Sequence, residues 1–307
     1  MLGPRKNLTH KTYMSDSANK ILVPVDFEEQ SMIAMEQAAH VAKLIHADIV
    51  LLYVIEESSG LMSRFFSKQM DEDMRKEIEK KLDEQITDLQ TKFNVKATKM
   101  VARGHVYDKI NEVADMVNAR MIVMGTSGGG GLRKRFIGSN ALRVVREAKV
   151  PVITIKGKHH RDGCKNIVLP LDLTKETREK VMKAIDFAKM YSSDIRVVSV
   201  LFTTDEFIVN RLTRQLSQVK SVIEKAGINV TAEIIKGIRG EESLGQIVVD
   251  YANKVEGDLI LIMTQQEQDI TEYFIGSAAQ EVIYKSDVPV LSIVPTPKKD
   301  LSEFTPY

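Results

Sequence analysis

The sequence lacks several features that would assign it to a specialised class of protein. It has one cysteine, Cys164, in 307 residues, so it cannot form an internal disulfide, which fits a reducing compartment. Its formal net charge is +1, which gives no electrostatic reason to expect binding to nucleic acid or an anionic membrane. No apolar run approaches the roughly 18 residues of a membrane-spanning helix, and the N-terminus lacks the apolar core of a signal peptide. We therefore expect a soluble, cytoplasmic protein without nucleic-acid or membrane partners.

The composition is that of a globular protein. Hydrophobic residues make up 43% of the chain and charged residues 28%, without a low-complexity bias. Since domains usually contain about 100 to 200 residues, the length predicts two of them.

An internal repeat supports two domains of one kind. Three segments return in the same order: ILVPVDF (21–27) as IVLPLDL (167–173), FIGSNALRVV (136–145) as FIGSAAQEVI (274–283), and KVPVITI (149–155) as DVPVLSI (287–293). The predicted boundaries are a disordered arm (1–19), a first domain (20–157), a polar linker (158–165), a second domain (166–295) and a tail (296–307).

The hydrophobic period alternates between that of strands and that of helices. Each half has five short apolar, β-branched runs; those of the first half are 21–25, 49–55, 96–102, 120–125 and 151–155. Between them lie segments with an apolar residue every three or four positions, such as 31–45 and 107–118. Strands that are apolar throughout, separated by amphipathic helices, predict a parallel sheet covered on both faces. The fold class is α/β, with two tandem doubly wound domains of five strands and four helices, whose ligands bind at the carboxyl ends of the strands.

The glycine-rich stretch MGTSGGGGLRKRFIGSN (124–140) follows the fourth strand of the first half. It is not a Walker A loop, because Lys134 has neither a glycine before it nor a hydroxyl residue after it. A Rossmann fingerprint would follow the first strand instead. What remains is the spacing Gly125-x2-Gly128-x9-Gly138-Ser139, ahead of a helix that Ser139 is predicted to cap. A helix N-terminus preceded by glycine is a site for anions such as phosphate, and Arg133, Lys134 and Arg135 either add positive charge or form a solvated surface.

This spacing, with PVDF in a first strand and PVI in a last one, resembles the universal stress protein family, which groups with the adenine-nucleotide α-hydrolase-like folds. The resemblance covers nearly the whole chain after residue 19, as a tandem pair, although Ser127 stands where many relatives have histidine. It implies that the first domain binds ATP, with Mg²⁺. The implied nucleotide-binding residues are Val25 and Asp26 beside the adenosine, Val54 at the adenine, Met124 and Gly125 at the ribose, and Gly128, Gly138, Ser139 and Asn140 at the phosphates.

The second half departs from this pattern. Aligning Gly276 with Gly138 places residues 264 to 268 where the first half has its glycines, in a segment that reads as one residue shorter. Side chains and negative charge replace open backbone there, and what remains of the site is Asp172, Val200, Gly276 and Ser277. We expect the second domain to keep the fold and to lose the nucleotide.

Several residues also have a simpler structural interpretation. Asp26 could cap the following helix through the N–H of Gln30 or Ser31. The segment HHRDGC (159–164) is read as linker rather than as a zinc site, because it offers only three ligands. The apolar residues of segment 58–70 fit a lid, a partner-binding patch or packing under a loop.

The resemblance implies a regulatory or stress-response protein, in which the final strands of the two halves pair as an internal pseudo-dimer. We also expect two chains to associate as a homodimer. No catalytic residue is assigned, and at most weak ATP hydrolysis is expected. The alternatives are an ATP-using phosphoryl or adenylyl transfer enzyme, and a nucleotide-free protein that recruits a partner.

Overall fold

The computed structural model describes residues 19–56, 68–126, 138–157, 163–172, 177–238, 240–266, 273–274 and 277–293. The predicted arm and tail, the centre of the glycine run and the histidines of the linker lie outside these residues, as does most of segment 58–70.

The first domain alternates strands and helices as predicted. Its elements are β1 (Lys20–Pro24), α1 (Glu29–Ile45), β2 (Asp48–Ile55), α2 (Lys68–Asp88), a π-helical turn (Leu89–Phe93), β3 (Ala97–Arg103), α3 (Val106–Met116), β4 (Met121–Gly125), α4 (Ser139–Glu147) and β5 (Val152–Ile155). The strands lie in the order β3-β2-β1-β4-β5, and each pairs in parallel with its neighbour. The carboxyl ends of all five strands therefore share one edge.

The second domain repeats this arrangement. Its elements are β6 (Asn166–Pro170), α5 (Thr177–Tyr191), β7 (Asp194–Leu201), α6 (Glu206–Lys225), β8 (Val230–Lys236), α7 (Leu244–Lys254), β9 (Leu259–Met263), α8 (Ser277–Lys285) and β12 (Val290–Ile293). The second domain also contains a small antiparallel hairpin of β10 (Gln265–Gln266) and β11 (Tyr273–Phe274), which the sequence pattern does not predict.

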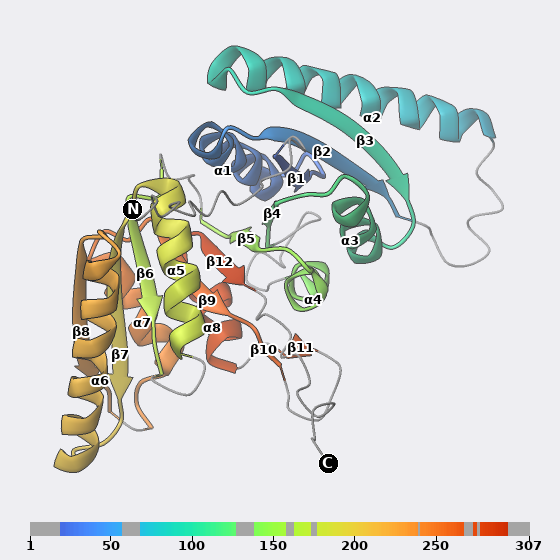
Figure 1. Ribbon diagram of the computed structural model, residues 1–307. Coiled ribbons are helices and arrows are strands. Elements are labelled where there is room, and N and C mark those ends of the chain that lie inside the picture. The colour runs from blue at the N-terminus through green and yellow to red at the C-terminus, as the bar shows by residue number, and fades with distance from the viewer. Residues whose placement is uncertain are drawn as a thin grey trace, which may run out of the picture.

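The two domains join through their last strands. β5 and β12 pair antiparallel, with Ile153 opposite Leu291, and fuse the two halves into one ten-stranded sheet (Figure 1). Each strand would otherwise be an exposed apolar edge, so the pairing satisfies the backbone groups of both. The predicted internal pseudo-dimer is confirmed in this form.

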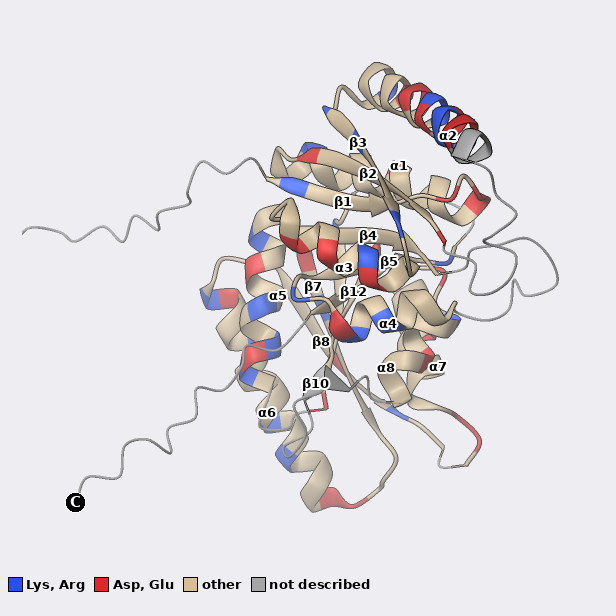
Figure 2. Ribbon diagram, turned by 90° about the vertical axis from the view of Figure 1, so that its right-hand side faces the viewer, with Lys and Arg blue, Asp and Glu red and all other residues tan. Residues whose placement is uncertain are grey.

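Helices cover both faces of the sheet because the strand residues alternate between two cores. Ile21 and Val23 face the core under α1 and α2, whereas Leu22 faces the core under α3 and α4. α2 lies along β3 and buries Ile78 and Leu82, while its outer face carries alternating charges (Figure 2). The predicted doubly wound α/β fold, present twice, is confirmed.

Candidate functional site

The candidate site lies where β1, β2 and β4 end and α4 begins. Val25, the first residue after β1, is buried, and its N–H donates to the carbonyl of Leu52 at 2.9 Å. This bond holds the chain beside β2 for one further residue before it turns toward α1. Asp26 is therefore delivered to the carboxyl edge with an exposed side chain.

Asp26 organises the turn between β1 and α1. Its carboxylate accepts the N–H of Glu28 at 3.0 Å, and its own N–H donates to the hydroxyl oxygen of Ser31 at 3.2 Å. The Ser31 hydroxyl in turn donates to the carbonyl of Glu28 at 3.0 Å. The alternative that Asp26 caps α1 through Gln30 or Ser31 is wrong, because its carboxylate accepts the N–H of Glu28, which is the N-cap residue itself. The turn fixes Asp26, and its exposed carboxylate can accept a further hydrogen bond.

Val54 presents backbone polar groups beyond the end of β1. Successive residues of a strand direct these groups to opposite sides, and Leu52 directs its carbonyl toward Val25. The N–H and C=O groups of Val54, two residues further on, point to the same side as those of Leu52. The chain after β1 has already turned away at that point. On the other side, the Ile55 carbonyl accepts the N–H of Gly104, next to β3. The position suits a ligand with a donor and an acceptor on one edge, such as adenine.

Met124 and Gly125 lie at the end of β4, and the structure gives both a packing role. Met124 is 6% exposed and its side chain belongs to the core under α3 and α4. A Cβ at Gly125 would lie 3.0 Å from the backbone carbon of Gln30, so glycine is required for α1 to approach β4. The sequence predicts that Gly125 lies close to a ribose. In the structure the first turn of α1 lies close to Gly125 instead.

Gly138, and not Ser139, caps α4. Gly138 has extended backbone angles, its N–H donates to the Thr126 carbonyl at 2.6 Å, and its own carbonyl accepts from Ala141 at 3.1 Å. The predicted Ser139 cap is wrong, because Ser139 is already the first helical residue and is exposed. As N1 and N2 of the helix, the amides of Ser139 and Asn140 lack intrahelical acceptors. They face the edge where β4 ends; Gly128, Arg133, Lys134 and Arg135 lie outside the described residues.

An aromatic pair that the sequence analysis missed borders Asp26. The rings of Phe27 and Tyr53 stack with centroids 5.2 Å apart, and Lys81 of α2 lies 5.6 Å from the Phe27 ring centre. Phe27 adopts a left-handed φ of 65°, which an ordinary residue keeps only when its surroundings impose it. Burial, and then the charge of Asp26, raises the pKa of Tyr53. An aromatic residue directly after the aspartate was the sequence signal.

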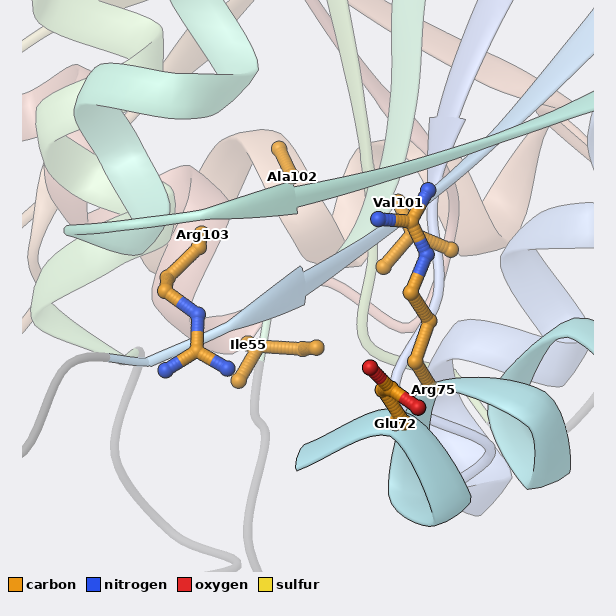
Figure 3. Close-up of a pocket in the computed structure, with 6 residues that line it drawn as sticks. All are labelled: Ile55, Glu72, Arg75, Val101, Ala102 and Arg103. Atoms are coloured by element: carbon orange, nitrogen blue, oxygen red, sulfur yellow. The ribbon is translucent and has the colours of Figure 1, made fainter. Parts of the chain in front are cut away.

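A cavity of about 210 Å³ opens beside this site, between α2 and the ends of β2 and β3 (Figure 3). Ile55, Val101, Ala102 and Arg103 line it from the strands, and Glu72 and Arg75 from α2. Ile55 directly follows Val54, but none of the predicted site residues lines the cavity. The Arg75 guanidinium is paired with Glu79 at 2.8 Å on the same helix. The cavity is therefore a neighbour of the candidate site and not the site itself.

No metal centre is found among the described residues, where no three histidine, cysteine, aspartate or glutamate side chains gather. Cys164, expected in a polar linker, is 2% exposed. Burial raises the pKa of its thiol to about 12, so the thiol is protonated at neutral pH. His159 and His160 lie outside the described residues.

The second domain carries a different arrangement at the same place. The Thr126 N–H donates to Ile155 and the Thr264 N–H to Ile293, and α4 and α8 begin at the equivalent Ser139 and Ser277. The two intervening segments are therefore equal in length, and the predicted one-residue shortening is wrong. In the second domain part of this segment pairs as the hairpin β10–β11. The four paired residues are equivalent to Ser127, Gly128, Arg135 and Phe136 of the first domain, so a ladder holds the position of Gly128.

Comparison with known proteins assigns the family. The model of the universal stress protein family matches this chain twice, over residues 18–156 and 163–293. The chain belongs to the universal stress protein family.

Individual relatives agree with this assignment. Universal stress protein MJ0531 of Methanocaldococcus jannaschii is 30% identical over 139 residues, which cover 45% of this chain and 81% of the relative. A crystal structure of a universal stress protein from Archaeoglobus fulgidus aligns with a TM-score of 0.71 and 19% identity, over 92% of this chain and 98% of that one. The second likeness shows that the paired two-domain fold has a solved counterpart.

Among the described residues, none of the helices combines the length and the apolar character that crossing a bilayer demands.

Proposed function

We propose that the first domain of this universal stress protein binds an adenine nucleotide, ATP with Mg²⁺, and that the chain acts as a regulatory protein of a stress response. One observation carries the proposal. Three kinds of group converge on one edge of the sheet: the Asp26 carboxylate, the backbone groups of Val54 and the amides of Ser139 and Asn140.

Each of these groups matches one part of a nucleotide. The exposed Asp26 carboxylate accepts the hydroxyl groups of a ribose. Val54 offers a donor and an acceptor for the edge of adenine. The first turn of α4 adds about half a positive charge and free amide donors for phosphate. Mg²⁺ would be held by the phosphates, because this ion is usually bound through substrate phosphates and few protein carboxylates.

The proposal is one of binding and not of catalysis. Backbone amides at a helix N-terminus hold phosphates in the ground state as well as in the transition state, and uniform binding of this kind does not accelerate hydrolysis. A regulatory role requires only that the nucleotide-bound and nucleotide-free forms differ toward a partner.

A homodimer, if it forms, must use a surface other than the last strands. β5 and β12 already pair with each other within one chain, so neither is available to a second copy.

The test compares two equivalent serines. Ser139→Asp places a carboxylate at the start of α4, where it repels phosphate but suits the helix dipole, so folding is preserved. Ser277→Asp makes the same change at the equivalent, exposed position of α8 and is the matched control. Nucleotide released on denaturation is identified by mass spectrometry, and affinity is measured by equilibrium dialysis with ATP.

We expect the wild-type protein and Ser277→Asp to carry adenine nucleotide, and Ser139→Asp to lose at least tenfold in affinity. Equal retention by all three proteins would show that α4 is not the phosphate site. No nucleotide in any of them, and no binding of added ATP, would refute the proposed function.

A further inference from the structure

The first strand and helix of the two domains can be compared position by position, because these elements keep the same spacing in both. β1 and β6 begin at Lys20 and Asn166, α1 and α5 end at Ile45 and Tyr191, and no insertion separates them. The left-handed residues that end the two helices, His46 and Ser192, are equivalent as well. By this register Asp172 corresponds to Asp26.

Lys180 stands on α5 where α1 has Ala34. Ala34 is fully buried on the sheet-facing side of α1. Lys180 is also buried, at 8% exposed, although lysine is almost never found so deep without a charge partner. Its partner is Asp172: the ammonium nitrogen lies 3.3 Å from both carboxylate oxygens. A lysine on the inner face of α5 therefore reaches the aspartate that is equivalent to the proposed ribose ligand.

Met263 stands at the end of β9 where β4 has Gly125. β4 and β9 end at these two equivalent residues, each followed by a threonine bonded to the last strand. Met263 is 6% exposed, so its side chain fills space at an edge where Gly125 has no side chain at all.

We propose that Lys180 and Met263 close the second domain to nucleotide from within. Lys180 neutralises Asp172, the aspartate equivalent to the proposed ribose ligand, and Met263 adds a buried side chain at the end of β9 where the first domain has Gly125. This inference rests on the proposed function for the identity of the ligand. It adds that one chain binds one nucleotide, and that two side chains outside the glycine segment contribute to this limit.

The experiment restores the residues of the first domain in the second. Lys180→Ala and Met263→Gly are combined in one chain, and Met182→Ala with Lys189→Ala serves as control, because both of these residues are exposed on the same helix. Native mass spectrometry with saturating adenosine and, separately, with ATP counts the ligands bound per chain. Circular dichroism checks that each variant is folded, and Lys180→Met alone provides a milder variant that keeps the apolar stem.

We expect one ligand per chain in the wild-type protein and the control, and a second adenosine in the K180A/M263G protein. A wild-type protein that binds two would overturn the inference, and so would a folded K180A/M263G protein that binds no more than the wild type. If the wild-type protein binds none, the proposed function fails, but adenosine bound by K180A/M263G alone would still support the inference. The Lys180→Met protein is expected to bind the second adenosine only in part. A folded Lys180→Met protein that loses the ligand of the first domain would count against the inference.

Discussion

Gly125→Ala tests the packing of α1 on β4, on which the position of Asp26 depends. The added methyl carbon would lie 3.0 Å from both the backbone carbon and the Cβ of Gln30, and 3.1 Å from its carbonyl oxygen. Carbon atoms in favourable contact are about 3.5 to 4.0 Å apart, so helix and strand must separate by roughly half an ångström. The obstacle is backbone in the first turn of a helix, which cannot rotate away as a side chain would.

Overpacking of this kind costs about 1 to 3 kcal/mol, and the gain of about 0.4 to 1 kcal/mol from a less flexible unfolded chain offsets part of it. We therefore expect the free energy of unfolding of the first domain to fall by about 1 to 2 kcal/mol. The shift also displaces the turn formed by Asp26, Glu28 and Ser31, so nucleotide affinity should fall with stability.

Urea denaturation gives the stability, and amide hydrogen exchange locates the change. Protection should fall in the first turn of α1 and at the end of β4, while the second domain serves as an internal control. Wild-type stability in the Gly125→Ala protein, within about 0.5 kcal/mol, would refute the packing argument.

Three further results are expected. Burial raises the pKa of the folded Cys164 thiol from 9.0 to about 12, so as the pH rises the unfolded chain loses this proton before the folded protein does. The free energy of unfolding therefore falls as the pH rises above 9. In urea denaturation between pH 8 and 10.5, Cys164→Ala should remove up to about 1.4 kcal/mol of this loss per pH unit, and an unchanged slope would contradict the assignment. For Lys180 and Asp172, a double-mutant cycle with Lys180→Met and Asp172→Asn should give a coupling near 1 kcal/mol, since the aspartate side chain is 41% exposed; zero coupling would mean that the pair does not hold in solution. Phe27→Leu should lose the ring contact with Tyr53 and destabilise the first domain by about 0.5 to 1.5 kcal/mol, and equal melting temperatures would argue against the stacked pair.

The architecture could be predicted from the sequence because it depends on local, repeated patterns. A run such as 121–125 is apolar throughout because both of its faces are covered, and the helices between the strands keep one apolar side. The repeat predicted the second domain, and the family resemblance implied the pairing between the apolar strands 152–155 and 290–293. The family resemblance added the candidate nucleotide residues, which remain predictions.

What the sequence missed lies in contacts between residues distant along the chain. Ser139 had the chemistry of a cap, but the bond from Gly138 to Thr126 fixes the chain one residue earlier. Gly125 was predicted to lie at the ribose. In the structure its neighbour is Gln30, 95 residues earlier in the chain.

By itself the sequence determined two α/β domains and the strand edge at which a ligand is expected, because burial imposes a period on each segment separately. Only the tertiary structure decided that α1 needs Gly125, and that Lys180 turns inward to Asp172 in the second domain. Such choices depend on how closely a helix and a strand approach in space, a distance that no local pattern encodes.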